Sequence, residues 1–160
     1  MRHEFNTAVG EEPCPVSMKG SEDQLRIMID KIPTLAWACR PDGTTEFLNQ
    51  RWLDYTGLSL EEALGWGWQV PVHPEDLGKL MEAWQGLLGS ADPGEAEARL
   101  RRFDGEYRWF LFRAVPVRDE QQKIVRWYGT NTDIEDLKRA EERGLALQQE
   151  LEFEIGRAHV

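Results

Sequence analysis

The stretch RRFDGEYRWFLFRAVPVRDEQQKIVRWYGTNTDIEDLKRAEE (Arg101–Glu142) decides the fold, because it predicts two long strands, two turns and a closing helix. Its Asp-Gly pair at positions 104–105 is a strong tight-turn signal. That turn separates a strand at Glu95–Arg102 from one at Tyr107–Arg118, and a third strand follows at Ile124–Thr132. Strands joined by such short turns pair antiparallel.

The preceding residues predict a second hairpin. Strands at Thr34–Arg40 and Thr45–Leu48 flank the turn Pro41-Asp42-Gly43-Thr44, in which proline presets φ and glycine accepts a positive φ. Since hairpins need no parallel crossover, the sequence predicts one antiparallel sheet of five strands.

Three helices are predicted between the two groups of strands. Asn49 is placed to cap a short helix that ends at Gly57, and Ser59 with Glu62 has the spacing of a capping box for the next. The longest helix, Pro74–Leu88, begins with proline and two carboxylates, which suit a helix N-terminus. Together these elements predict an α+β fold with helices on one face of the sheet.

The domain boundaries follow from where the periodic patterns begin and end. Residues 1–20 predict a flexible leader and residues 21–32 a flanking helix, within a domain that spans 21–135. Residues 136–153 predict a coiled-coil helix. The end of the chain, EIGRAHV (154–160), fits no heptad and reads like a translated sequencing adapter, so we expect a non-native tail and an output domain that is missing.

Composition excludes several classes of function. A net charge of −10 disfavours nucleic acid as a partner, and no apolar run approaches the length of a membrane span. Two cysteines, Cys14 and Cys39, and no secretory leader indicate a cytoplasmic protein with reduced thiols.

With this order of elements, the motifs resemble a PAS domain with its C-terminal PAC half. PDGTTEFLNQRWLDYTGLSLEEALGWGW (41–68) is similar to the first half, and HPEDL (73–77) with Arg101–Glu142 is similar to the second. The resemblance implies a sensory, dimerising module that precedes a histidine kinase, as in two-component systems, or a cyclic-dinucleotide enzyme. The sequence itself offers no base placed beside a reactive centre, so we expect no catalytic residue in this chain.

The cofactor stays unknown from the sequence, but two kinds are disfavoured. Flavin photoreceptors of the family carry a cysteine in a GxNCRFLQ motif, whereas GLSLEEAL (57–64) has none. Haem-binding members place a histidine on the long helix, whereas His73 precedes that helix at a capping position. The sequence also offers no set of metal ligands at the usual spacing around His73.

A ligand pocket is predicted on the inner face of the sheet. By resemblance, Asn131 stands where flavin-binding relatives direct a glutamine at the ligand, and Gly129 leaves room for that ligand. The alternative is that the aromatic residues simply fill the core. The other candidates for the lining are Trp37, Phe47, Trp52, Tyr55, Leu80, Trp84 and Trp127.

The last strand runs into the C-terminal helix through Asp133, Ile134 and Glu135. Family members use an Asp-Ile-Thr corner here, so Glu135 replaces a hydroxyl that ties the helix to the sheet. The helix then carries an a/d seam that predicts a homodimer, and the alternative is a helix folded back on its own sheet. Apolar residues on both faces of the strand Tyr107–Arg118 also favour a dimer, although the helix at 21–32 is an alternative cover. The seam residues are Leu137, Ala140, Gly144, Leu147 and Leu151.

Overall fold

The computed structural model describes residues 23–24, 27–31 and 33–158, which fall into two units, residues 1–33 and residues 34–160. In the first unit the described positions 23–24 and 27–31 are helical, as predicted for the flanking helix. The expected leader, residues 1–20, lies outside the described residues, as do His159 and Val160 of the expected tail.

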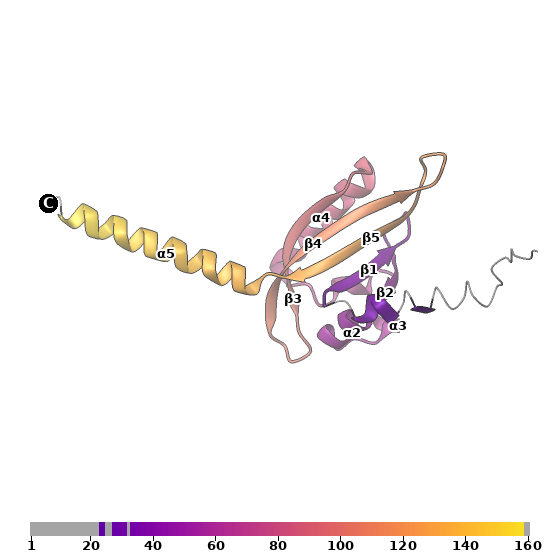
Figure 1. The fold of residues 1–160 in the computed structure, drawn as a ribbon, viewed down its shortest axis with the longest axis horizontal. Coiled ribbons are helices and arrows are strands. Elements are labelled where there is room, and N and C mark those ends of the chain that lie inside the picture. The colour runs from indigo at the N-terminus through magenta and orange to yellow at the C-terminus, as the bar shows by residue number, and fades with distance from the viewer. Residues whose placement is uncertain (1–22, 25–26, 32, 159–160) are drawn as a thin grey trace, which may run out of the picture. The chain divides into compact units, whose positions relative to one another are not determined.

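The second unit is built on a five-stranded antiparallel sheet, which confirms the predicted fold class (Figure 1). The strand order β2-β1-β5-β4-β3 places the last strand of the chain in the centre. Residues of β5 that face inward therefore lie in the middle of the sheet. The strands are β1 (Leu35–Cys39), β2 (Thr45–Leu48), β3 (Gly94–Arg101), β4 (Tyr107–Arg118) and β5 (Ile124–Asp133).

Four helical segments connect the two hairpins: α2 (Gln50–Thr56), α3 (Leu60–Ala63), the 3₁₀ turn η2 (Gly67–Gln69) and α4 (Pro74–Ser90). Their ends follow the predicted caps. The Asn49 side chain accepts a hydrogen bond from Trp52 N at 3.1 Å, and Ser59 and Glu62 form the capping box. Because Asn49 also donates to Thr34 O at 3.0 Å, it fixes α2 to the strand beside it.

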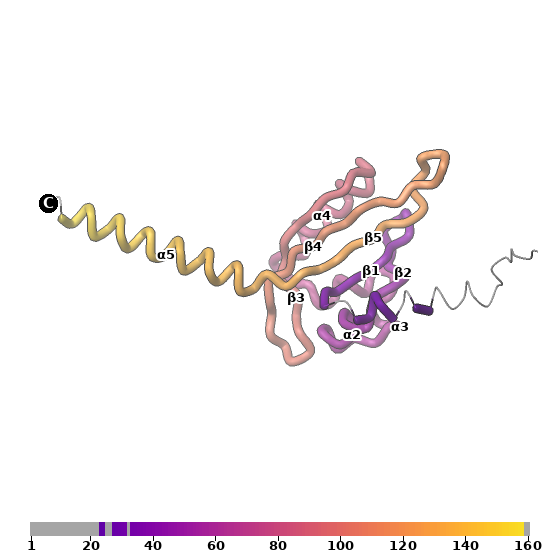
Figure 2. The backbone as a smooth tube through the Cα atoms, viewed as in Figure 1, coloured from indigo at the N-terminus to yellow at the C-terminus, as the bar shows by residue number. Residues whose placement is uncertain are grey.

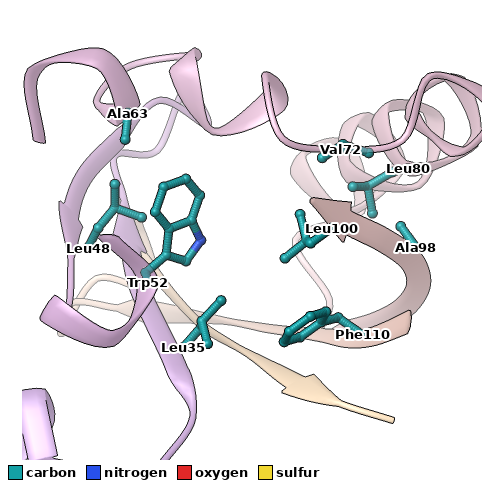
Figure 3. Packing of buried hydrophobic residues seen from close by; sticks show 9 residues of the cluster. All are labelled: Leu35, Leu48, Trp52, Ala63, Val72, Leu80, Ala98, Leu100 and Phe110. Carbon is teal, nitrogen blue, oxygen red and sulfur yellow. The ribbon is translucent and has the colours of Figure 1, made fainter. Parts of the chain in front are cut away.

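The core lies between the sheet and these helices. Trp52 from α2 and Leu80 from α4 are almost fully buried with Phe110 of β4 (Figure 3). A second group joins Trp84 of α4 to Trp127 of β5. Both helices thus cover the same face of the sheet.

The last helix, α5 (Glu135–Ala158), follows β5 after a single residue. The backbone runs from β5 directly into this helix (Figure 2). It includes residues 154–158 of the segment that the sequence predicted as a tail. None of its described residues is buried.

Candidate functional site

A cavity of about 150 Å³ lies between the inner face of the sheet and the helical segments. Every strand and three of the helical segments contribute to its wall. The wall is mainly apolar. Five aromatic residues form much of it: Trp37, Trp52, Trp68, Trp84 and Phe112. Smaller residues complete it: Cys39, Thr45, Leu48, Leu80, Ala83, Leu87, Gly94, Glu95, Ala96, Leu100, Ala114 and Asn131.

Gly129 and Trp37 pair across β5 and β1, and the indole of Trp37 lies directly over the glycine. A Cβ at position 129 would stand 2.0 Å from Trp37 Cζ2, far inside van der Waals contact. Gly129 does leave room, as the sequence suggested, but a side chain of the protein fills that room. The glycine therefore fixes the position of one cavity wall.

Asn131 is the polar residue at the centre of the sheet, and its side chain is 2% exposed. Its Oδ1 accepts a hydrogen bond from Trp37 Nε1 at 2.9 Å. An indole N–H can only donate, so this bond fixes which end of the amide is oxygen. The backbone carbonyl of Asn131 is held by the Thr34 hydroxyl at 2.9 Å.

The structure brings Trp37, Trp52, Leu80, Trp84 and Asn131 together in the wall and places the other candidates elsewhere. Phe47 lies opposite Ala38, on the far side of the sheet from Trp37. A β-bulge between Ala38 and Cys39 causes this, since it shifts the alternation of β2 by one residue.

Tyr55 and Trp127 support the wall from behind. The Tyr55 hydroxyl donates to Leu100 O at 2.9 Å, and its ring packs edge-on against Phe110. Burial raises the pKa of Tyr55 well above its ordinary value, so the hydroxyl remains a donor. Trp127 is fully buried and packs edge-on against Trp84, with ring centroids 5.2 Å apart.

Trp68 is a wall residue that the sequence analysis missed. It lies in the turn η2, within the run Gly65-Trp66-Gly67-Trp68. Gly67 is required there, because a Cβ would stand 1.8 Å from Glu62 O. The available signal was the glycine directly before Trp68, which indicates a tight turn at the position that places the indole. The Trp68 Nε1 atom is buried and has no hydrogen-bond partner among the described residues.

Cys39 lies in the wall as a buried thiol. Its side chain is 3% exposed, and burial raises its pKa to about 11. The Sγ atom is within 3.6 Å of the Thr45 hydroxyl, so the two groups satisfy each other. They are small and neutral components of the cavity surface.

The corner from β5 to α5 is tied to β4 by three interactions. Asp133 accepts from Glu135 N at 2.9 Å, capping the helix, and pairs with Arg108 at 2.7 Å. The Glu135 carboxylate accepts from Trp109 N at 2.8 Å, while Ile134 N donates to Trp109 O at 2.8 Å. Glu135 thus links helix to sheet at the position where the family has a hydroxyl.

Two cations also lie over the faces of Trp109. The guanidinium of Arg99 and the ammonium of Lys138 are each 5.0 Å from the ring centroid. Lys138, in the first turn of α5, also pairs with Glu97 of β3. The helix start is therefore linked to both β4 and β3.

The predicted seam of α5 is open to solvent. Leu137, Leu147 and Leu151 are 57%, 65% and 61% exposed, and Ala140 and Gly144 are exposed between them. Three and four residues separate successive members, so they share one stripe of the helix.

His73 is the one histidine among the described residues. No cluster of His, Cys, Asp and Glu in this part of the chain is placed to hold a metal ion. His73 caps α4, with Nδ1 accepting from Glu75 N at 3.1 Å. None of the described helices has the length and apolar character needed to cross a bilayer.

Residues 45–131, more than half of the chain, match the PAS fold family. The chain belongs to the PAS family. The sheet and the connecting helices described above are thus those of a PAS domain, as the sequence motifs indicated.

Parts of two larger proteins are similar to this PAS domain. It is 36% identical over 118 residues to the peroxide stress-activated histidine kinase mak1 of Schizosaccharomyces pombe, a match that covers 73% of this chain and 7% of that protein. It is 35% identical over 123 residues to the uncharacterized protein y4lL of Sinorhizobium fredii, covering 77% and 15%. The chain thus spans only a small part of these relatives.

A solved structure gives the same fold. An RNA-binding light-oxygen-voltage receptor superposes with a TM-score of 0.69 at 17% identity, covering 89% of this chain and 42% of that one. At this identity the likeness concerns the fold alone.

Proposed function

We propose that this PAS domain is the sensory module of a larger cytoplasmic signalling protein, in which a small molecule bound in the aromatic cavity controls a dimeric output helix. The observation that carries the proposal is the cavity itself, about 150 Å³ with Asn131 in its wall. An apolar cavity with a few placed polar groups is the usual form of a small-molecule site. The match to a histidine kinase favours a kinase as the output domain.

The path from cavity to helix is short. Asn131 lies in the wall, and Asp133, two residues later on β5, caps α5. A ligand that moves Asn131 therefore acts on the strand that carries the corner Asp133–Glu135. Such a ligand shifts the population between two arrangements of the helix only if it binds one of them more tightly.

The element that receives the signal from the cavity is a pair of α5 helices in a homodimer. The stripe Leu137, Ala140, Gly144, Leu147 and Leu151 supplies an apolar seam of heptad spacing on a helix whose other residues are mainly charged or polar. A seam of just over two heptads is weak on its own, so the sheet domain has to contribute to the contact.

The apolar part of the outer sheet face is suited to take part in the dimer contact. Val115 and Tyr128, paired neighbours on β4 and β5, are 49% and 43% exposed. Burying such side chains against a second copy is favourable by about 25 cal/mol per Å².

The alternative function is a PAS module that dimerises without a ligand. The position of Trp37 favours it, because its indole already fills the space over Gly129. In that case the cavity is a packing defect and the aromatic residues form a core.

One measurement separates these functions, and a second tests the dimer that both require. Native mass spectrometry of protein purified from its own host is expected to show a small molecule bound noncovalently to a dimer. A dimer without such an adduct supports the alternative, if no compound in a small-molecule library raises its thermal stability. Leu147→Asp is expected to weaken the dimer in sedimentation equilibrium, while Gln148→Asp, one residue off the seam, is not. A monomer at high micromolar concentration in the parent chain contradicts both.

A further inference from the structure

The cavity wall contains N–H donors that lack hydrogen-bond partners. This excess of donors over acceptors indicates what kind of ligand the cavity suits. Asn131 is the first case, because its Oδ1 is already engaged by Trp37 Nε1 and its amide nitrogen therefore faces away from that bond. No described residue accepts a hydrogen bond from that nitrogen, which belongs to a side chain only 2% exposed in the wall of the cavity.

Trp52 and Trp68 supply the second and third donors. The indole nitrogen of Trp52 lies on the side of the ring that faces Leu100, another wall residue (Figure 3). It has no acceptor among the described residues, and neither has the buried Trp68 Nε1. By contrast, the other two indoles of the wall are satisfied, Trp37 by Asn131 and Trp84 by Gly43 O at 3.4 Å.

The wall offers no matching surplus of acceptors or charge. The Thr45 hydroxyl and the Cys39 thiol engage each other. The one charged wall residue, Glu95, is solvent-exposed and pairs with Arg113 at 3.0 Å. An anion in the cavity would lose its hydration with no cation beside it, and a ligand cation would find no enclosed carboxylate.

The volume limits the ligand further. A cavity of about 150 Å³ is the size that accepts a benzene-sized molecule. It is below the roughly 300–1,000 Å³ of sites that take drug-sized ligands, and so below what a three-ring flavin or a haem needs.

Resting on the proposed sensory function, we propose that the cavity binds a neutral, single-ring molecule that carries a hydrogen-bond acceptor such as a carbonyl, and that the Asn131 amide nitrogen is the donor that selects it. The apolar body of the ligand packs among the tryptophans. Its acceptor pairs with a donor of the cavity wall that no described residue engages, so an analogue without the acceptor binds less well.

Acetophenone and α-methylstyrene test this selection on the unaltered protein, because they have nearly the same shape and differ by a C=O in place of a C=CH₂. We expect isothermal titration calorimetry to show about tenfold tighter binding of the ketone. Benzoate, with the same ring and a charge, is expected not to bind. Equal affinities for the ketone and the alkene overturn the proposal, as does preferred binding of benzoate.

Asn131→Leu is expected to remove the preference for the ketone while α-methylstyrene still binds. Thr132→Val is the matched control, since Thr132 lies next to Asn131 on β5 but outside the cavity wall, and it should retain the preference. A preference that persists in Asn131→Leu overturns the role of the amide.

Failure of this inference differs from failure of the proposed function. If ketone and alkene bind equally, the cavity is a ligand site without the selection inferred here. If the protein binds neither compound and no other small molecule, the cavity is not a sensory site and both proposals fail.

Discussion

Replacing Gly129 by alanine is expected to displace the indole that forms one wall of the cavity. The added Cβ would stand 2.0 Å from Trp37 Cζ2 and 2.4 Å from two further ring atoms. Ordinary contact begins near 3.4 Å, so the ring has to move by roughly 1.5 Å. A shift of that size breaks the 2.9 Å hydrogen bond from Trp37 Nε1 to Asn131.

The expected loss of stability is about 3 kcal/mol. Overpacking of a well-packed core costs about 1–3 kcal/mol, and loss of the Trp37–Asn131 hydrogen bond costs about 1 kcal/mol more. For a chain of this size the midpoint of thermal unfolding falls by about 10 °C. The ring moves toward the cavity, so binding of any small molecule there should weaken in parallel.

Thermal and urea unfolding followed by far-UV circular dichroism measure this loss. Gly86→Ala is the matched control, because a Cβ at this exposed position of α4 meets nothing within 4 Å, and it should be neutral or slightly stabilising. Trp37→Phe removes the atoms that clash, so combining it with Gly129→Ala should cost less than the sum of the single changes. If the free energy of unfolding of Gly129→Ala lies within about 0.5 kcal/mol of the parent value, Gly129 is not needed to make room for the Trp37 indole.

Three further results are expected. Glu135→Ala should leave Trp109 N without its acceptor, speed hydrogen exchange at that amide and lower the free energy of unfolding by about 1 kcal/mol, whereas Glu135→Gln should keep the acceptor. Equal exchange rates in the two variants would contradict a link between Glu135 and Trp109. Asp76 accepts three hydrogen bonds from Arg99, which lower the pKa of the carboxyl group, so the stability that this group contributes is present above the unfolded pKa near 3.9 and is lost as pH falls through the lower folded pKa. Asp76→Asn should therefore cost about 2 kcal/mol at pH 7 and flatten the acid side of the curve of unfolding free energy against pH. An unchanged acid side would exclude a contribution of the Asp76–Arg99 pair. Because burial raises the pKa of Cys39 to about 11, the folded protein should not react at that thiol with a disulfide reagent at pH 8 until it unfolds; fast native labelling mapped to Cys39 would contradict this.

Much of the fold could be predicted because its signals are local. Asn49, Ser59 with Glu62, and the Asp-Gly turn at 104–105 each specify an element boundary within a few residues, and the structure has all three. The inward face of β5 could be predicted from simple alternation, since no β-bulge interrupts the strand between Trp127, Gly129 and Asn131.

The cavity depended on features that alternation does not show. The bulge beside Cys39 turned Phe47 to the other face of the sheet, and nothing in the strand's composition marks that extra residue. The contact of Trp37 with Gly129 joins two strands that are 92 residues apart in sequence, so it is a property of register alone. The link from Glu135 to Trp109 is likewise a long-range contact.

The edge-on packing of Trp37, Trp84 and Trp127 has an optical consequence. The ring centroids are 5.7 Å and 5.2 Å apart along this series, close enough for the three indoles to share electronic excitation. Light absorbed by the buried Trp127 can therefore be emitted or lost at Trp37, in the cavity wall. Occupancy of the cavity by a carbonyl compound, which accepts energy or an electron from an excited indole, should dim the emission of the whole series, so that the protein reports its own ligand without any attached dye.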